Sequence, residues 1–403
     1  MKEEPLFKWL NPLLLTIFLL YTDMAYSKEI YVPDDYESIQ EAVVASTKGD
    51  IVIVRDGTYA THKTYIIALY TDGVSIRSEN GPERCILDGE NTGETGGIHC
   101  GIGVTGSSEI SGFTIMNCFQ GIIMYNMASP VIRDCVIKNN TVDNWGGGGI
   151  YLQNSSPLFI DCTISGNSCT RNSYMGGGGI CCDMSSSPTF MNCTITGNSA
   201  EIGGGLSAFS SHATLINCIV SGNTAKNRGG GLYWKKRSTP TLINCVITGN
   251  KAPIGGGIYS HGSHPKLTNC TISMNDKDGI RCAGSNPVIA NTILWDNGRE
   301  IVRPRRGKPK HYPDPHVLYS NIKGGFAGEG NLDSDPGFID PHSGDFRLKK
   351  DSPCIDAGSN DVKSLPETDT NGNPRIVGGI VDIGAYEHIG DSSTDQNEAR
   401  PGK

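Results

Sequence analysis

The chain has 403 residues, of which 52 are glycine, 37% are hydrophobic and 19% are charged, and its formal net charge is −8. Many glycines and few charges favour short strands and turns, and they argue against a helical bundle or a disordered chain. The acidic balance argues against a nucleic-acid partner, which requires a basic surface.

Residues 1–27 have the pattern of a signal peptide. Lys2 and Lys8 supply positive charge, residues 10–21 are apolar, and Ala25 and Ser27 occupy small-residue cleavage positions. The apolar stretch is too short for a comfortable membrane span. We therefore predict cleavage after Ser27, with an uncleaved anchor as the alternative. No stable membrane span is expected after cleavage, and the mature protein is predicted to be secreted or held at the cell surface or cell envelope.

Residues 28–97 are predicted to form an N-terminal cap and the first coils. A short helix is expected after Asp34 or Asp35, either of which can cap it, and Gly49 ends it. One face of this helix carries Ile39, Ala42, Val43 and Ser46. Apolar runs at 51–57 and 64–70 then predict the first strands.

Residues 98–298 contain a repeated phrase. It reads PTLINCVITGN at 240–250, and related copies begin at residues 130, 157, 188, 213 and 265, with a seventh copy at 287–297 that lacks the cysteine. A glycine run and an aliphatic residue follow the copies. The repeat length of about two dozen residues, rich in Ile, Val and Thr, is typical of one coil of a parallel β-solenoid. We predict an all-β parallel β-helix with three strands per coil.

The alternation within the phrase predicts which side chains face the core. Leu242, Cys245 and Ile247 are expected to point inward, and Asn244 is expected to form a corner, because Asn tolerates left-handed backbone angles. The equivalents of Asn244 are Asp134, Asp161, Asn192, Asn217, Asn269 and Asn291. A second corner is predicted at Asn140, Asn167, Asn198, Asn223, Asn250, Asn275 and Asn297. Stacked asparagines of this kind can form a ladder of amides that satisfies the buried backbone.

Six of the 14 cysteines fall in one inward column of the repeats, and Cys100, Cys182 and Cys282 fall in a second. Neighbours in such a column lie about 4.8 Å apart along parallel strands, whereas disulfides require Cβ atoms about 3.5–4.5 Å apart with converging vectors. Buried free thiols are therefore predicted, with disulfides as the alternative. No CxxC pair occurs, so a zinc site has no support.

The repeats resemble those of right-handed parallel β-helix proteins of the pectate-lyase-like superfamily, over roughly residues 30–300. Residues 299–330 then form a basic, proline-rich connector. Residues 331–388 resemble the choice-of-anchor Q type C-terminal domain, through motifs such as 344–348 (GDFRL), 355–358 (IDAG) and 382–387 (DIGAYE). This resemblance implies a small irregular domain, and residues 389–403 are predicted to be a disordered tail.

The residues just after each glycine run form the candidate functional face. Its first outward column is His99, Ile123, Tyr151, Cys181, Ser207, Tyr233, Tyr259 and Arg281. Its second outward column is Tyr125, Gln153, Asp183, Phe209, Lys235 and His261. Aromatic rings beside polar groups suit sugar binding, although aromatic residues also favour strands for other reasons.

The predicted glycan-binding residues are the aromatic and amide members of this face, with two further aromatic residues on the inserted loops that would rim it. They are Tyr125, Tyr151, Gln153, Phe209, Tyr233, Tyr259, Trp145 and Tyr174.

The alternative is a polysaccharide lyase acting on uronans, as the resemblance implies. Such an enzyme needs a basic side chain and Ca²⁺ held by clustered carboxylates. The weak catalytic candidates are Asp183, Lys235, His261 and Arg281. A single carboxylate makes a poor calcium site, so no metal site and no cofactor are predicted, with Ca²⁺ needed only if the protein is a lyase.

The sequence therefore favours a monomeric exported scaffold that binds an extracellular polysaccharide or cell-surface glycan, with no assured catalysis and no nucleic-acid partner.

Overall fold

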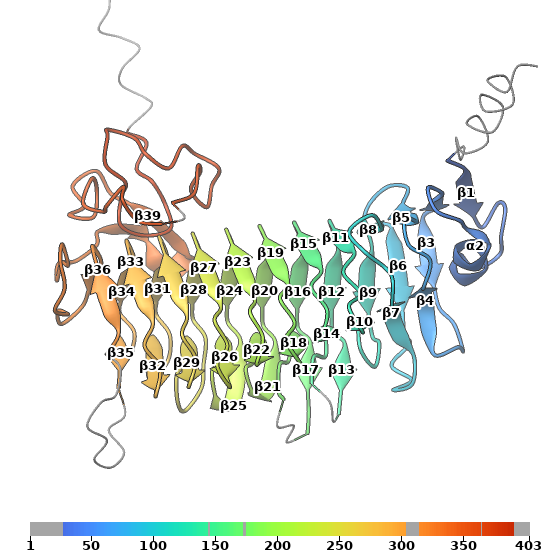
Figure 1. The fold of residues 1–403 in the computed structure, drawn as a ribbon, viewed down its shortest axis with the longest axis horizontal. Helices are drawn as coiled ribbons and strands as arrows, with labels where there is room; N and C mark the ends of the chain where they lie inside the picture. Colours follow the sequence, from blue (N-terminus) through green and yellow to red (C-terminus); the bar gives the residue numbers. More distant parts are fainter. Residues whose placement is uncertain (1–26, 144–145, 172–174, 304–313, 364, 391–403) are drawn as a thin grey trace, which may run out of the picture.

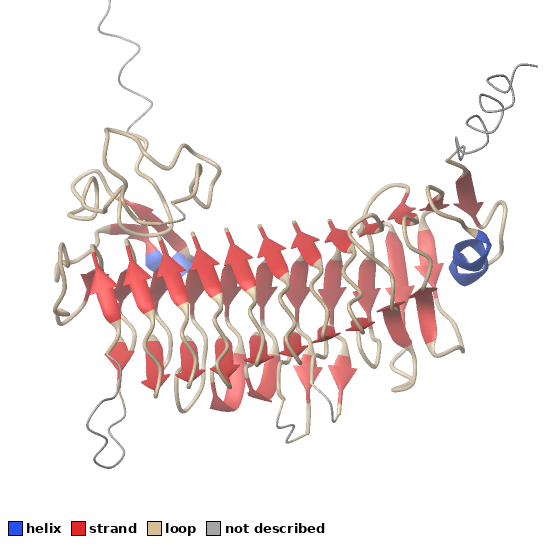
Figure 2. Cartoon of the chain, in the orientation of Figure 1, coloured by secondary structure: helices blue, strands red, loops and turns tan. Residues whose placement is uncertain are grey.

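The computed structural model describes residues 27–143, 146–171, 175–303, 314–363 and 365–390. These residues form a long solenoid of parallel strands, with a smaller C-terminal unit packed on its side near one end (Figure 1). Strands dominate and the described residues include one short α-helix (Figure 2). The predicted all-β fold with three strands per coil is confirmed. The predicted signal peptide, apart from Ser27, and nearly all of the predicted tail lie outside the described residues.

Three long sheets form the walls of the solenoid. The first sheet has 12 strands, in the order β1 (Glu29–Val32), β2 (Ile51–Val54), β5 (Ser75–Ser78), β8 (Glu109–Ser111), β11 (Val131–Arg133), β15 (Leu158–Ile160), β19 (Thr189–Met191), β23 (Thr214–Ile216), β27 (Thr241–Ile243), β30 (Lys266–Thr268), β33 (Val288–Ala290) and β36 (His316–Leu318). The second sheet has 10 strands, namely β4 (Tyr65–Leu69), β7 (Gly96–Cys100), β10 (Ile122–Tyr125), β14 (Ile150–Gln153), β18 (Ile180–Asp183), β22 (Leu206–Phe209), β26 (Leu232–Lys235), β29 (Ile258–His261), β32 (Ile280–Ala283) and β35 (Ile301–Val302). The third sheet has 11 strands, namely β3 (Gly57–Tyr59), β6 (Cys85–Asp88), β9 (Thr114–Met116), β12 (Val136–Lys138), β16 (Thr163–Ser165), β20 (Thr194–Thr196), β24 (Ile219–Ser221), β28 (Val246–Thr248), β31 (Thr271–Ser273), β34 (Ile293–Trp295) and β37 (Asn321–Ile322).

A fourth, short sheet lies between the third and second strands of the middle coils and was not predicted. It consists of β13 (Thr141–Val142), β17 (Ser168–Cys169), β21 (Ser199–Ile202) and β25 (Thr224–Arg228).

The first predicted corner is confirmed at every coil. Leu242, Cys245 and Ile247 are fully buried, and Asn244 has φ +52°, in the left-handed region. The six equivalent residues also have positive φ, between +49° and +54°: Asp134, Asp161, Asn192, Asn217, Asn269 and Asn291. A polar residue that tolerates this conformation therefore breaks the strand alternation and directs the next cysteine into the core.

The second corner holds a continuous ladder of buried asparagines. Asn223 is representative: its Nδ2 donates to the Asn250 Oδ1 at 3.0 Å and to the Ile195 carbonyl at 2.9 Å, and its Oδ1 accepts from the Asn198 backbone N–H at 3.0 Å and from the Asn198 Nδ2 at 3.0 Å. The same pattern runs from Asn140 to Asn297. The left-handed conformation at this corner belongs to the preceding residue, such as Gly222 with φ +63°. The asparagines therefore join the coils, while their neighbours make the turn.

The core is one column of apolar side chains and thiols. All 14 cysteines are buried and free, which confirms the predicted thiols. Burial raises the pKa of the Cys100 and Cys282 thiols to about 12. Trp234 is fully buried between the shorter Ala208 and Ser260 of the flanking strands.

The N-terminal end is covered by helix α2 (Ile39–Ala45), which buries Ile39, Ala42 and Val43. Its N-cap is Ser38, and Ser38 and Glu41 form a reciprocal capping box. The predicted caps Asp34 and Asp35 were wrong because other groups bind their carboxylates. Asp34 pairs with Arg55 at 2.6 Å, and Asp35 accepts from the Tyr31 backbone N–H at 2.8 Å.

The coils extend beyond residue 298, where the repeats were predicted to stop. β36 pairs with β33 and β37 pairs with β34, so residues 316–322 complete the first and third sheets. The partly buried Phe326 packs against the core at this end. This last coil was not predicted because its sequence diverges and lacks the repeated phrase. Among the described residues, no helix is long and apolar enough to cross a membrane.

The C-terminal unit contains the antiparallel pair β38 (Phe338–Asp340) and β39 (Asp345–Leu348), joined by the 3-10 helix η1 (Pro341–Ser343). It binds the first-corner residues of the last coils. Asn269 Nδ2 donates to the Asp382 carbonyl, and Asn291 exchanges two hydrogen bonds with the Ser359 backbone. An apolar cluster completes the interface and includes Val246, Ile293, Phe338, Phe346, Leu348, Ile383 and Ala385.

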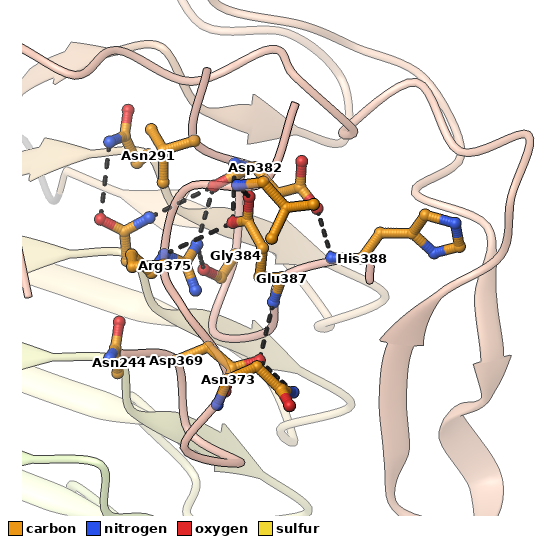
Figure 3. Close-up of polar contacts among 12 residues, drawn as sticks. Asn244, Asn291, Asp369, Asn373, Arg375, Asp382, Gly384, Glu387 and His388 are labelled. Atoms are coloured by element: carbon orange, nitrogen blue, oxygen red, sulfur yellow. Dashed lines mark hydrogen bonds and ion pairs between the residues drawn. The ribbon is translucent and has the colours of Figure 1, made fainter. Parts of the chain in front are cut away.

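A buried polar cluster organises this unit (Figure 3). The Arg375 guanidinium is 1% exposed and donates through Nη2 to the Asp382 and Gly384 carbonyls. The Glu387 carboxylate accepts from the Val377 and Asp382 backbone N–H groups. Asp369 accepts from backbone N–H groups at Asn371 and Asn373. These contacts give the carboxylates structural roles.

Replacement of Asn223 by alanine tests the ladder. It leaves buried backbone groups of neighbouring coils without partners, each costing about 1–3 kcal/mol. We therefore expect the free energy of unfolding to fall by about 3–5 kcal/mol, measured by urea denaturation. Asn227→Ala, at an exposed position, is the control and should change stability by less than about 0.5 kcal/mol. Equal effects of the two substitutions would contradict the ladder.

Alkylation of the cysteines tests the thiol columns. Because these thiols are buried, and burial withholds them from the reagent, we expect iodoacetamide to modify almost none in the native protein and all 14 after unfolding without reductant. Mass spectrometry counts the modified sites. Bonded pairs in the unfolded, unreduced protein would show that the columns are oxidised.

Candidate functional site

The predicted functional face is the outer side of the second sheet. The register aligns its residues in rows across the strands: Tyr151 pairs with Cys181, Tyr233 with Tyr259, and Lys235 with His261. The two predicted outward columns therefore exist as continuous lines along the solenoid.

The first outward column is largely covered, contrary to prediction. Tyr151, Tyr233 and Tyr259 are only 2%, 3% and 7% exposed. Ile202 of β21 and Ile254 pack over Tyr233 and Tyr259, together with Phe209 of the second column. The segments that carry Ile202 and Ile254, between the second corner and the glycine run, are called the covering segments here. With them, this part of the column is a second apolar layer and not a flat exposed ridge.

The face opens at its N-terminal end into a groove of about 430 Å³. The aromatic groove, as we call it, has walls of Tyr65, Phe119, Ile123, Tyr125 and Tyr151, and its polar lining includes Thr64, Glu94, Gln120 and Gln153. Three predicted residues, Tyr125, Tyr151 and Gln153, thus come together here. Tyr65, Phe119 and Glu94 were missed because they belong to coils that precede the clear copies of the phrase.

The rings of the groove form a connected row. Ring centroids of Tyr65 and His99 lie 4.7 Å apart, those of His99 and Tyr125 5.8 Å, and those of Tyr125 and Tyr151 5.7 Å. Burial raises the pKa of the Tyr65, Tyr125 and Tyr151 phenols and lowers the pKa of the His99 imidazole. These side chains are therefore uncharged near neutral pH, and they offer apolar faces together with neutral hydrogen-bonding groups.

The C-terminal half of the face is different because it is cationic. The Tyr233 and Tyr259 rings stack at 5.4 Å and 4°, and the Arg228 guanidinium lies 5.5 Å from the Tyr259 ring centroid. Burial, followed by the charges of Lys235 and Arg228, lowers the pKa of His261. This half could attract an anion but has little open surface over its rings.

The four catalytic candidates do not form one site. Lys235 and His261 are neighbours in paired strands. Asp183 is 7% exposed and lies on β18, separated from the Lys235 strand by β22. Arg281 donates to the buried Asp278 carboxylate at 3.2 Å, so its guanidinium has a structural role. Within the described ranges, no three His, Cys, Asp or Glu side chains are placed to hold a metal ion.

The predicted rim residues Trp145 and Tyr174 lie outside the described residues. Their loops approach each other at Arg171 and Asp143, whose charged groups are 3.5 Å apart.

A family model described as "Right handed beta helix region" matches residues 30–178, 100–251 and 178–307, together more than half of the chain. The structure resembles the crystal structure of pectate lyase Pel9A, at 13% sequence identity and a TM-score of 0.58, covering 90% of this chain and 97% of that one. Pectin methylesterase PemA from Erwinia chrysanthemi aligns at 10% identity and a TM-score of 0.35, covering 71% of this chain and 93% of its own. No curated protein is significantly similar in sequence. These likenesses describe the fold.

The pKa of His261 tests whether the Lys235 and His261 side chains are neighbours in one row. Lys235→Met removes a like charge beside His261, so the His261 pKa should rise by a few tenths of a unit to about one unit. NMR titration of the imidazole measures it. Lys138→Met, on β12 of the third sheet, should leave this pKa unchanged. An unchanged His261 pKa in Lys235→Met would mean that the two side chains are not neighbours.

Proposed function

Because this chain belongs to the right-handed β-helix family, we propose that it is an exported carbohydrate-binding protein that acts as a scaffold without catalysis. The aromatic groove is the observation that carries this proposal. Its rings and amides are the groups that bind sugars, through stacking on the apolar faces and hydrogen bonds to hydroxyls. Its volume of about 430 Å³ is within the usual range for ligand sites.

The partner under this proposal is an extracellular polysaccharide or a cell-surface glycan. The pattern of residues 1–27 supports export. The likeness of residues 331–388 to the choice-of-anchor Q type domain supports a place at the cell surface or in the secreted fraction. No cofactor is proposed, and the protein is taken to act as a monomer.

A second candidate function is a polysaccharide lyase. It is favoured by the Lys235–His261 pair and by the shared fold with a pectate lyase, and such an enzyme would require Ca²⁺. Asp183 is the only carboxylate among the predicted catalytic residues, and it lies two strands away from Lys235. This arrangement supports binding over β-elimination.

Binding to a panel of polysaccharides tests the proposal. Affinity electrophoresis of the mature protein should show retardation by at least one glycan. Tyr65→Ala and Tyr125→Ala each remove a half-buried ring of the groove, and we expect each to weaken binding about three- to tenfold, as about 0.5–1.5 kcal/mol of lost ring contact implies. Tyr319→Ala, on the residue directly after β36 of the first sheet, is the matched aromatic control and should bind as wild type does.

Two results would overturn the proposal. One is the absence of binding to every glycan. The other is formation of unsaturated product from a uronan with Ca²⁺, read by absorbance and lost in Lys235→Ala.

A further inference from the structure

We infer that the aromatic groove selects a neutral glycan and rejects uronans. The inference rests on the proposed function and names the ligand class of the same site. It comes from the distribution of charge along the outer face of the second sheet.

The groove itself offers nothing to pair with a sugar carboxylate. Among the described residues that line it, Glu94 is the one charged side chain, and none is lysine or arginine. The phenols remain protonated and His99 remains neutral, because burial raises the phenol pKa values and lowers that of the imidazole. A bound uronate would therefore enter a site with no described cation in its lining.

One acidic group lies within the groove and one lies beside its last strand. Glu94 is part of the lining and precedes β7, the second strand of the groove, by two residues. At the β14 end, Gln153 pairs with Asp183 of the next strand. A carboxylate between two carboxylates is repelled, and partial removal of water strengthens this effect.

The cations of the face are too far away to compensate. Lys235 lies on β26 and Arg228 on β25, and three strand steps separate Gln153 from Lys235. With about 4.8 Å between neighbouring strands, that separation is roughly 14 Å. This exceeds the screening length of about 8–10 Å at physiological salt.

The polar lining fits hydroxyl groups. Gln120 has its Nε2 bound to the Gly146 carbonyl at 2.8 Å, which fixes the orientation of its amide. The half-buried Gln153 and the protonated phenols offer both donors and acceptors, as paired sugar hydroxyls require. The groove spans β4 to β14 along the solenoid axis, so an extended neutral chain can lie along the row of rings.

Isothermal titration with hexasaccharides of neutral β-glucan, xylan and mannan, and with hexagalacturonate, tests the inference. At least one neutral ligand should bind at least tenfold more tightly than hexagalacturonate. Tyr125→Ala should weaken that binding, whereas Tyr259→Ala, under the covering segments, should not. Circular dichroism confirms that each variant is folded.

Substitutions that change the charge of the groove test the preference for neutral ligands more directly than removal of a ring. Glu94→Gln should weaken the discrimination against hexagalacturonate, and Glu94→Lys with Gln153→Lys should reverse it while both variants keep their rings. Each change in preference should shrink as salt is raised.

Hexagalacturonate binding to the wild-type protein that is at least as tight as any neutral ligand would overturn the neutral-glycan inference, while leaving the carbohydrate-binding function in place. If that binding is lost in Lys235→Met, the cationic half is the site. Binding to none of the four ligands and to none of the wider panel would overturn the proposed function itself.

Discussion

The fold depends on one constraint: every buried amide at the second corner must find its partner in the next coil. Each asparagine from Asn140 to Asn297 binds the coil beside it through both side-chain atoms. In the coil of Asn223, a shift of one residue would place Gly222 or Thr224 in that position and leave several buried groups unpaired. The ladder therefore fixes the register, and the fixed register aligns the outward columns in rows.

The same regularity explains how much the sequence reveals. Leu242, Asn244 and Cys245 recur with a fixed spacing, so local alternation predicted their burial and corner geometry. Ser38 was harder to recognise, since Asp34 and Asp35 precede the same helix and only their contacts with Arg55 and Tyr31 exclude them as caps.

The burial of Tyr233 could not be predicted from its own strand, because it depends on Ile202 and Ile254 of the covering segments. Ile202 ends β21, a strand of four residues, and Ile254 forms only an isolated bridge with Arg228. Only some residues of the groove were predicted from the sequence. Tyr125 and Gln153 lie in coils with a recognisable glycine run or repeat, whereas Tyr65 and Phe119 come from coils with a different sequence.

The first corner serves a second purpose near the C-terminal end. Asn269 and Asn291 keep the left-handed conformation of their column, and their side chains also bind the backbone of the C-terminal unit. A corner side chain points away from the core, so this use leaves the packing of the solenoid unchanged. The Asp382 and Glu387 carboxylates of the polar C-terminal motif stabilise the backbone of the C-terminal unit itself, because they accept hydrogen bonds from its N–H groups. These contacts give the motif a structural role and do not identify a reactive site.

In such a solenoid, the residues that stack on neighbouring coils and the residues that are free to vary occupy different positions. The inward residues and both corners are constrained by neighbouring coils, whereas an outward residue meets only its row neighbours and whatever covers it. One face can consequently carry a groove without cations at Tyr65, Tyr125 and Gln153 and a cationic region at Lys235 and Arg228 without any change in the fold. The covering segments decide which part is open, since Ile202 and Ile254 close the rings at one end while the groove remains accessible at the other. Under the proposed function, two local features would therefore set the choice of ligand, namely the charge of the outward rows and the segment after each ladder asparagine. Neither is specified by the repeated phrase.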